Sequence, residues 1–242
     1  MTLSVATLVQ QLSALGVHPG ALVMVHAGLR AVGPVEGGAA GVIRAIRSTI
    51  GPDGTMVMLL GADPDDPFDV DESEVDVEDM GVLAEVFRTT AGTRCSDHAV
   101  ARYGALGPLT DALLRAPPLH DYHGPGSVLE RIVDRGGLVL RLGAGPDTVT
   151  LTHLAEYRCD VSDKRRARRR YERADIGEQW IEGLDDDDGI AEWAHGDYFP
   201  QVLIDFLAAG HARRGPVGGC VAELLPASAF VDFAGDWLNR NL

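Results

Sequence analysis

The chain has 242 residues, 45% of them hydrophobic and 24% charged, which is enough apolar material for one large folded domain. Its 36 acidic and 21 basic side chains give a formal net charge of -15 at pH 7. Because affinity for nucleic acid comes chiefly from Lys and Arg neutralising phosphates, this balance argues against a nucleic-acid partner. A cationic partner suits it better, although acidity that serves only solubility explains the charge equally well.

The three cysteines, Cys95, Cys159 and Cys220, are an odd number with neither CxxC nor His-rich spacing. They predict neither a disulfide framework nor a structural metal. Residues 1–11 carry no basic leader, and no stretch approaches the roughly 18 apolar residues of a membrane span. We therefore expect a cytoplasmic protein without a membrane partner.

The first part of the chain alternates helical and strand patterns. Apolar residues at helical spacing predict a helix over 2–15, with Thr2 as its N-cap, and a second helix over 38–50. Short apolar runs over 21–26 and 55–60 predict buried strands. Strand, crossover helix and strand in succession are typical of a parallel βαβ unit.

Residues 63–79 are dense in Asp and Glu and contain Pro64 and Pro67, which is typical of a loop. Such a loop faces either solvent or a cationic ligand. The patterns after it predict helices over 81–88 and 107–114, a strand over 137–143 with a glycine-rich turn at 143–145, a helix start over 150–157 and a helix over 199–209.

Seven basic side chains crowd into 164–173, whereas Asp185–Asp188 is wholly acidic. The usual explanation for a basic run is a solvated strand, helix face or loop; the alternatives are a site for cofactor phosphates or an oligomer contact, so a homodimer stays open. No repeat or linker divides the chain. We expect a single α/β domain over 1–242 with a smaller appended region.

His153 and Glu156 lie three residues apart at the start of a predicted helix, so both can share one helix face just beyond a strand end. An imidazole there can take a proton from an amine at neutral pH. A histidine at a helix start also serves structure alone, and this alternative stays open.

Other histidines give weaker signals. His26 ends a strand before Ala27 and Gly28, where the backbone can approach a ligand or simply turn. His98 and His123 lie in turn-like segments, and no carboxylate partner marks a metal site among them. The sequence has no G-x-S-x-G elbow, Walker loop or complete G-x-G-x-x-G, which argues against serine-hydrolase and nucleotide chemistry.

Seven short blocks follow one another in the order of a known enzyme family. They are V-H-A-G-L-R-A-V-G at 25–33, 51–58, M-G-V-L-A-E-V-F-R at 80–88, 94–98, 123–128, 142–156 and G-P-V-G at 215–218. The most specific block ends in His153 and Glu156 and resembles L-L-G-[VC]-x-x-[DN]-x-x-T-x-x-H-x-A-E. Together the blocks resemble the aminoglycoside 3-N-acetyltransferases of the antibiotic N-acetyltransferase family, closest to the apramycin-accepting branch.

The resemblance implies a three-layer α-β-α sandwich, with 158–200 as an acceptor-binding insertion. It implies direct transfer of an acetyl group from acetyl-CoA to the 3-amino group of an aminoglycoside, with no metal and no covalent enzyme intermediate, giving antibiotic resistance. Two alternatives stay open: the same fold acetylating a different small-molecule amine, and a non-catalytic binding protein.

The resemblance also implies roles for individual residues. His153 is the base that deprotonates the amine, and Glu156 orients it. Implied acceptor-binding residues are His123, Asp63, Asp65, Asp185 and Asp187. Implied cofactor-binding residues are His26, Ala27, Gly28, Leu29, Arg30, Ser96 and Thr152. The family's paired serines are Ala27 and Gly28 here, and its second-block proline is Ala99, so backbone amides remain for acetyl-CoA where hydroxyls are lost.

Overall fold

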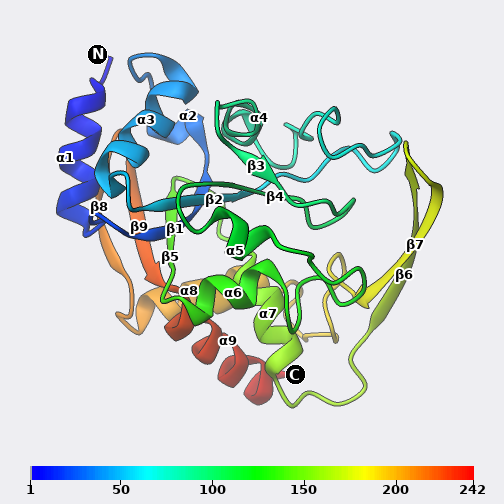
Figure 1. Cartoon of the computed structure of the whole chain (residues 1–242). Coiled ribbons are helices and arrows are strands. Elements are labelled where there is room, and N and C mark those ends of the chain that lie inside the picture. The colour runs from blue at the N-terminus through cyan, green and yellow to red at the C-terminus, as the bar shows by residue number, and fades with distance from the viewer. Residues whose placement is uncertain (1) are drawn as a thin grey trace.

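The computed structural model describes residues 2–242 and contains a seven-stranded sheet in the order β3-β4-β2-β1-β5-β9-β8 (Figure 1). Its strands are β1 Leu22–Ala27, β2 Thr55–Leu59, β3 Arg94–Cys95, β4 Tyr103–Leu106, β5 Leu138–Leu142, β8 Arg213–Val217 and β9 Cys220–Pro226. The helices are α1 Val5–Leu15, α2 Leu29–Val32, α3 Gly38–Ile50, α4 Val82–Arg88, α5 Thr110–Leu114, α6 Val128–Asp134, α7 Leu151–Arg158, α8 Phe199–Ala208 and α9 Ala227–Asn241.

The centre of the sheet is parallel. β1 pairs in parallel with β2 on one side and with β5 on the other, and α3 forms the crossover from β1 to β2. This confirms the predicted βαβ unit. β4 and β9 then pair antiparallel with β2 and β5, and β3 and β8 pair antiparallel with β4 and β9, so the outer parts of the sheet are antiparallel, which the apolar runs alone did not indicate.

The central strands read as continuous apolar runs because helices cover both sheet faces. Val23 and Val25 of β1 belong to the hydrophobic cluster beneath α1, α3 and α4, whereas Leu22 and Met24 belong to the cluster shared with α6 to α9. The molecule is therefore a three-layer α-β-α sandwich, as expected. Within residues 2–242, no helix is long and apolar enough to cross a membrane.

The beginning of α1 differs from the prediction. The helix starts at Val5, and the side chain of Ser4, not Thr2, accepts the hydrogen bond of the Thr7 backbone N–H at 3.1 Å. The prediction of Thr2 as N-cap was wrong because Leu3 is held by an isolated bridge to Val35, which keeps this part of the chain outside the helix. The helix predicted over 107–114 is likewise shorter and begins at Thr110.

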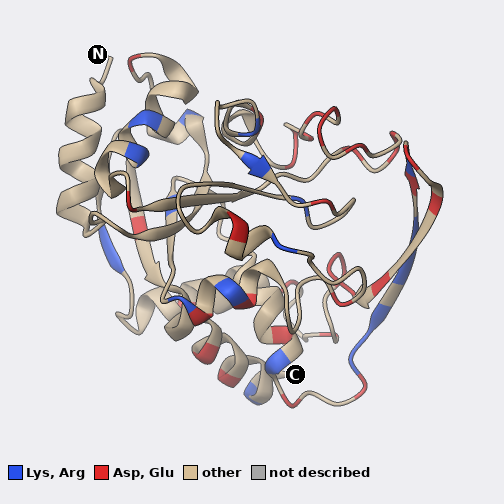
Figure 2. Cartoon of the chain, in the orientation of Figure 1, with Lys and Arg blue, Asp and Glu red and all other residues tan. Residues whose placement is uncertain are grey.

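The basic run forms a strand of a separate hairpin, β6 Arg166–Arg173 paired antiparallel with β7 Gly177–Leu184 (Figure 2). Its arginines mostly meet acidic partners: Arg166 pairs with Asp121 and Glu182, and Arg170 pairs with Glu178. The run is therefore a strand whose charge is largely matched. Its arginine-to-carboxylate pairing favours the structural explanation over a phosphate site.

Candidate active site

His153 and Glu156 meet on the first turns of α7. His153 Nδ1 lies 2.9 Å from Glu156 Oε2. A carboxylate oxygen only accepts, so the imidazole donates from Nδ1 and leaves Nε2 as an acceptor. The three-residue spacing seen in the sequence thus produces a histidine whose orientation a carboxylate holds.

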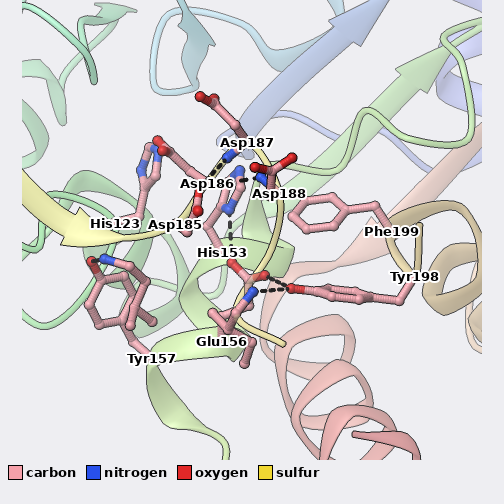
Figure 3. A network of polar contacts seen from close by, with 12 residues as sticks. His123, His153, Glu156, Tyr157, Asp185, Asp186, Asp187, Asp188, Tyr198 and Phe199 are labelled. Carbon is pink, nitrogen blue, oxygen red and sulfur yellow. Dashed lines mark hydrogen bonds and ion pairs between the residues drawn. The ribbon is translucent and has the colours of Figure 1, made fainter. Parts of the chain in front are cut away.

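Both oxygens of the Glu156 carboxylate are engaged (Figure 3). Oε1 accepts a hydrogen bond from the Tyr198 hydroxyl, and the same hydroxyl accepts the Ile190 backbone N–H at 2.9 Å. Glu156 is 1% exposed and Tyr198 2% exposed. The carboxylate therefore has no direct contact with solvent and acts only through these two partners.

The surroundings of His153 favour its protonated form. Burial lowers the pKa of His153, but the hydrogen bond and charge of Glu156, together with the charges of Asp186 and Asp187, raise the pKa above its ordinary value. The ring of His153 also contacts Phe199, with 4.8 Å between ring centroids. A histidine with a raised pKa is a stronger base than a free imidazole and suits removal of a proton from an amine.

One cavity of about 460 Å³ opens where β1 and β5 end. Its lining includes His26, Ala27 and Gly28, the turn 143–145, His123 and His153. Burial, with a smaller contribution from Arg141, lowers the pKa of His26 to about 3, so this ring is neutral at physiological pH. On this side the cavity offers an uncharged ring and close backbone, at the carboxyl ends of parallel strands where α/β folds bind ligands, while Glu78, Asp79, Asp147 and Asp186 also line it.

Gly28 is needed where it stands in this wall. Its N–H donates to the Leu142 carbonyl at 3.0 Å, and a Cβ placed on it would come within 2.5 Å of the Gly143 carbonyl oxygen. The ends of β1 and β5 therefore touch backbone to backbone. The loss of a serine at this position fits the close approach of the two chain segments.

A second cavity, of about 550 Å³, is strongly acidic. Four residues, namely Asp147, His153, Asp186 and Phe199, line both cavities, so His153 stands where the two meet. The acidic residues of the second cavity are Asp147, Asp186, Asp187, Asp188, Glu192 and Asp197, with Arg165 as a basic member. A cationic ligand in the acidic cavity would reach His153 directly.

Arg169 of β6 organises the acidic loop after β7. It forms ion pairs with Asp185, Asp186 and Asp187, and Tyr122 donates to Asp186 at 2.5 Å. Asp185 also accepts from the backbone N–H groups of the next residues in its own loop and is only 16% exposed, whereas the side chain of Asp187 is 73% exposed. Asp187 is thus the most exposed of the three carboxylates that pair with Arg169, and Asp185 holds the loop.

The other expected residues are dispersed. Asp63 lines a separate acidic cavity within its own loop, and Asp65 donates its N–H to Asp63 in the same loop. Ser96 is buried and hydrogen-bonded to Ala101 and Tyr103, and Thr152 is buried on α7. Leu29 and Arg30 belong to α2 and, like Ser96 and Thr152, are not among the residues lining the two cavities at His153.

Several residues of the site have no signature in the sequence. Tyr198 and Phe199 begin α8 more than forty positions after His153, and Asp147 lies in the turn before α7. The D-x-x-T portion of the 142–156 block was a weak signal for Asp147; nothing local marked the two aromatic residues. Among residues 2–242, no group of three or more His, Cys, Asp or Glu side chains is arranged to hold a metal ion.

The chain is similar to known proteins over nearly its whole length. The family model described as aminoglycoside 3-N-acetyltransferase matches residues 24–239. Aminoglycoside N(3)-acetyltransferase III of Serratia marcescens is 35% identical, with 98% of each chain covered. The structure of AAC-IIIb in a binary complex with CoASH is similar with a TM-score of 0.94, 34% identity and coverage of 99% of this chain and 97% of that one.

A further solved structure, AAC-VIa bound to sisomicin, has a TM-score of 0.92 and 30% identity, and covers 100% of this chain and 99% of its own. These likenesses extend over nearly the whole length on both sides, so they describe the entire domain and not a shared motif. The resemblance drawn from the seven blocks is confirmed. The chain belongs to the aminoglycoside 3-N-acetyltransferase family and is an enzyme of the acetyltransferase class.

Proposed function

We propose that this enzyme transfers the acetyl group of acetyl-CoA to the 3-amino group of an aminoglycoside antibiotic. The observation that carries the proposal is the place of His153, where a cavity walled by glycine backbone and His26 meets a more strongly acidic one. The first suits the acyl arm of the donor and the second a polycationic acceptor. The CoASH complex of one structural neighbour and the sisomicin complex of another support the two assignments.

The donor side rests on backbone groups. Gly28 and the turn 143–145 bring peptide groups to the cavity, while Ala27 offers no hydroxyl. Acetyl-CoA therefore binds there through main-chain hydrogen bonds and apolar contact, with His26 as a neutral ring in the wall. The side chains of Ser96 and Thr152 are buried and do not line this cavity, so we assign them no direct contact with acetyl-CoA.

The acceptor side rests on carboxylates. Asp187, an exposed member of the acidic loop, receives an ammonium group of the sugar, and Asp186 lines both cavities. Charge-assisted hydrogen bonds of this kind contribute about 1.5–3 kcal/mol each. The insertion 158–200 carries this loop, and through Arg169 its β6–β7 hairpin holds the loop in shape.

His153 supplies the proton transfer. Its Nε2 takes a proton from the acceptor ammonium, and the freed lone pair of the nitrogen attacks the thioester carbonyl carbon. The C–N bond forms and the C–S bond breaks. Coenzyme A leaves as the thiol with one of the two protons that the nitrogen loses, and the other proton reaches solvent from His153. Glu156 stabilises the imidazolium that forms transiently.

Acetylation converts an ammonium into a neutral amide, and so removes one of the charges by which an aminoglycoside binds its anionic target. We therefore assign the enzyme a role in antibiotic resistance. Expression of the chain in a susceptible bacterium should raise the inhibitory concentration of each drug that the purified enzyme acetylates.

The function is tested by thiol release from acetyl-CoA with purified protein. The acceptor panel is apramycin, gentamicin, kanamycin and an amine without an aminocyclitol ring, and His153→Ala is the control for enzyme-catalysed release. Release with an aminocyclitol, together with an acetamide located at the 3-amino group by NMR, supports the proposal. Release only with the simple amine would assign a different acceptor, and no release with coenzyme A bound would overturn the proposal.

A further inference from the structure

The Tyr198 hydroxyl binds the oxygen of Glu156 that His153 does not; Tyr198 lines the acidic cavity but is only 2% exposed. It donates to Glu156 Oε1, while Oε2 of the same carboxylate accepts from His153 Nδ1. The three groups form an unbroken chain of hydrogen bonds from the protein interior to the cavity (Figure 3). Since Glu156 and Tyr198 are both buried, no solvent competes for these bonds.

We propose that Tyr198 is a positioning residue of the transfer reaction: its hydroxyl fixes the Glu156 carboxylate and, through it, sets the orientation and proton affinity of His153. The inference rests on the proposed function of His153 as the base. Tyr198 does not touch the substrate in this proposal and acts only through Glu156.

Tyr198 is locked in place from two sides. Its hydroxyl accepts the Ile190 N–H at 2.9 Å, which leaves its own proton directed to Glu156. Gly189, in the left-handed region at φ +74°, passes so close that a Cβ there would come within 2.5 Å of the hydroxyl oxygen. The chain that carries the acidic loop thus depends on the same hydroxyl as the base. The Tyr198 hydroxyl therefore contacts both the end of the acidic loop, at Ile190, and the carboxylate that orients His153.

The neighbouring residue strengthens this placement. Phe199 packs on the His153 ring and Tyr198 binds Glu156. Two consecutive side chains at the start of α8 therefore contact the catalytic histidine and its carboxylate. α8 therefore positions both the carboxylate and the imidazole. Its register is set by hydrophobic burial of Val202, Leu203 and Phe206 in the core.

The chain offers a matched control in Tyr157. Its hydroxyl also accepts a backbone N–H of this region, that of Leu184 at 2.9 Å, and also donates to a carboxylate, that of Asp121 at 3.1 Å. Tyr157→Phe and Tyr198→Phe each remove one hydroxyl and leave one backbone N–H without its partner. The two variants differ in that only Tyr198 touches Glu156.

Several groups besides Glu156 act on the proton affinity of His153 and remain in every variant. Asp186 and Asp187 approach from the loop after β7, Asp147 lines both cavities beside it, and His123 stacks on its ring from the segment before α6. Their contributions are common to the wild type and to both tyrosine variants. A difference confined to Tyr198→Phe therefore reports the hydroxyl.

The first experiment compares kcat, KM and the pH profile of wild type, Tyr198→Phe and Tyr157→Phe. We expect Tyr198→Phe to lower kcat about tenfold or more, with the acceptor KM no further changed than in Tyr157→Phe. Without its donor, the negative charge of Glu156 acts more strongly on His153, so the acidic limb of the profile moves to higher pH. An unmoved limb, or a kcat equal to that of Tyr157→Phe, would overturn the inference.

The second experiment keeps the hydroxyl and changes its strength as a donor. Site-specific 3-fluorotyrosine at position 198 is nearly isosteric and donates more strongly, so it should draw charge from Glu156 and lower the pKa of His153. ¹⁵N-histidine NMR follows the imidazole directly, without turnover. A shift down with fluorotyrosine and up with Tyr198→Phe supports the inference; shifts in the same direction, or none, would overturn it.

The NMR titration separates this inference from the function on which it rests. A wild-type enzyme that releases no thiol with any acceptor contradicts the proposed function, while the pKa of His153 still reports whether Tyr198 acts on it. An active wild type in which both tyrosine variants behave alike retains the function and contradicts the positioning role. If Tyr198→Phe fails to fold, the fluorotyrosine variant carries the test alone.

Discussion

The imidazole rings of His153 and His123 lie stacked, with centroids 4.9 Å apart and planes 8° from parallel. Burial above all, and then the charge of His153, hold the pKa of His123 well below its ordinary value, whereas the pKa of His153 is raised. The pKa values of two histidines in contact are thus shifted in opposite directions. At neutral pH His123 is an uncharged surface against which His153 can change its protonation state.

The pH profile should show this difference. His153 must be neutral to accept a proton, and its raised pKa places the acidic limb of kcat/KM above the ordinary histidine value of about 6.5. Glu156→Gln removes the charge that raises the pKa, so the limb should move to lower pH while kcat falls about tenfold to a hundredfold. Rates measured from pH 5 to 9 provide the check. If the acidic limb of Glu156→Gln stays at the wild-type pH, the limb does not report the titration of His153.

Replacement of His153 tests the base itself. His153→Ala should lower kcat by about 10²–10⁴-fold, the usual contribution of general acid–base catalysis. Coenzyme A binding should be nearly intact, because the cavity wall formed by 26–28 and 143–145 is unchanged. Steady-state rates and calorimetric titration with coenzyme A measure the two effects. Equal rates for wild type and variant would remove His153 as the base.

Asp187 and Asp185 should respond differently to the same substitution. Asp187 is exposed in the acidic cavity, so Asp187→Asn should raise the acceptor KM several-fold, more at low salt than at high salt, with little change in Tm. Asp185 accepts from Arg169 and from two N–H groups of its own loop, so Asp185→Asn should lower Tm. Kinetics at two ionic strengths and thermal unfolding measure both, and a reversed pattern would exchange the roles assigned to these residues.

Sequence and structure agree best where local chemistry decides the conformation. The helix over 38–50 has the predicted bounds because its apolar spacing and the following Gly51 define both face and end. His153 and Glu156 could be paired from sequence because one helical turn joins them. Tyr198 could not be predicted, since its contact with Glu156 depends on how α8 packs after a long excursion through the β6–β7 hairpin.

The acidic stretches show a second limit. Net charge indicated a cationic ligand, but sequence alone could not distinguish the carboxylates that hold the loop from those that stay exposed. Asp185 and Asp187 are two positions apart and both pair with Arg169, which reaches them across a hairpin. Only Asp185 also accepts backbone N–H groups of the loop, and it is the less exposed of the two. Such pairing depends on strand register, which the charges themselves do not specify.

Restoring the family's serine at position 28 should harm this enzyme. Gly28 has φ -97° and ψ 92°, which any residue can adopt, so the cost of Gly28→Ser comes from the Cβ, which would come within 2.5 Å of the Gly143 carbonyl. Separating β1 from the turn after β5 should destabilise the fold by about 1–3 kcal/mol and raise the KM for acetyl-CoA.

Ala27→Ser is the control for this substitution, because position 27 already carries a Cβ and lines the same cavity. It adds a hydroxyl without moving the backbone, so its Tm should match the wild type and its KM for acetyl-CoA should not rise. Urea unfolding measures the stability of both variants, and steady-state kinetics measure their KM for acetyl-CoA. A Gly28→Ser enzyme as stable as the wild type would show that the turn yields easily, and the absence of the serine would then have no steric cause.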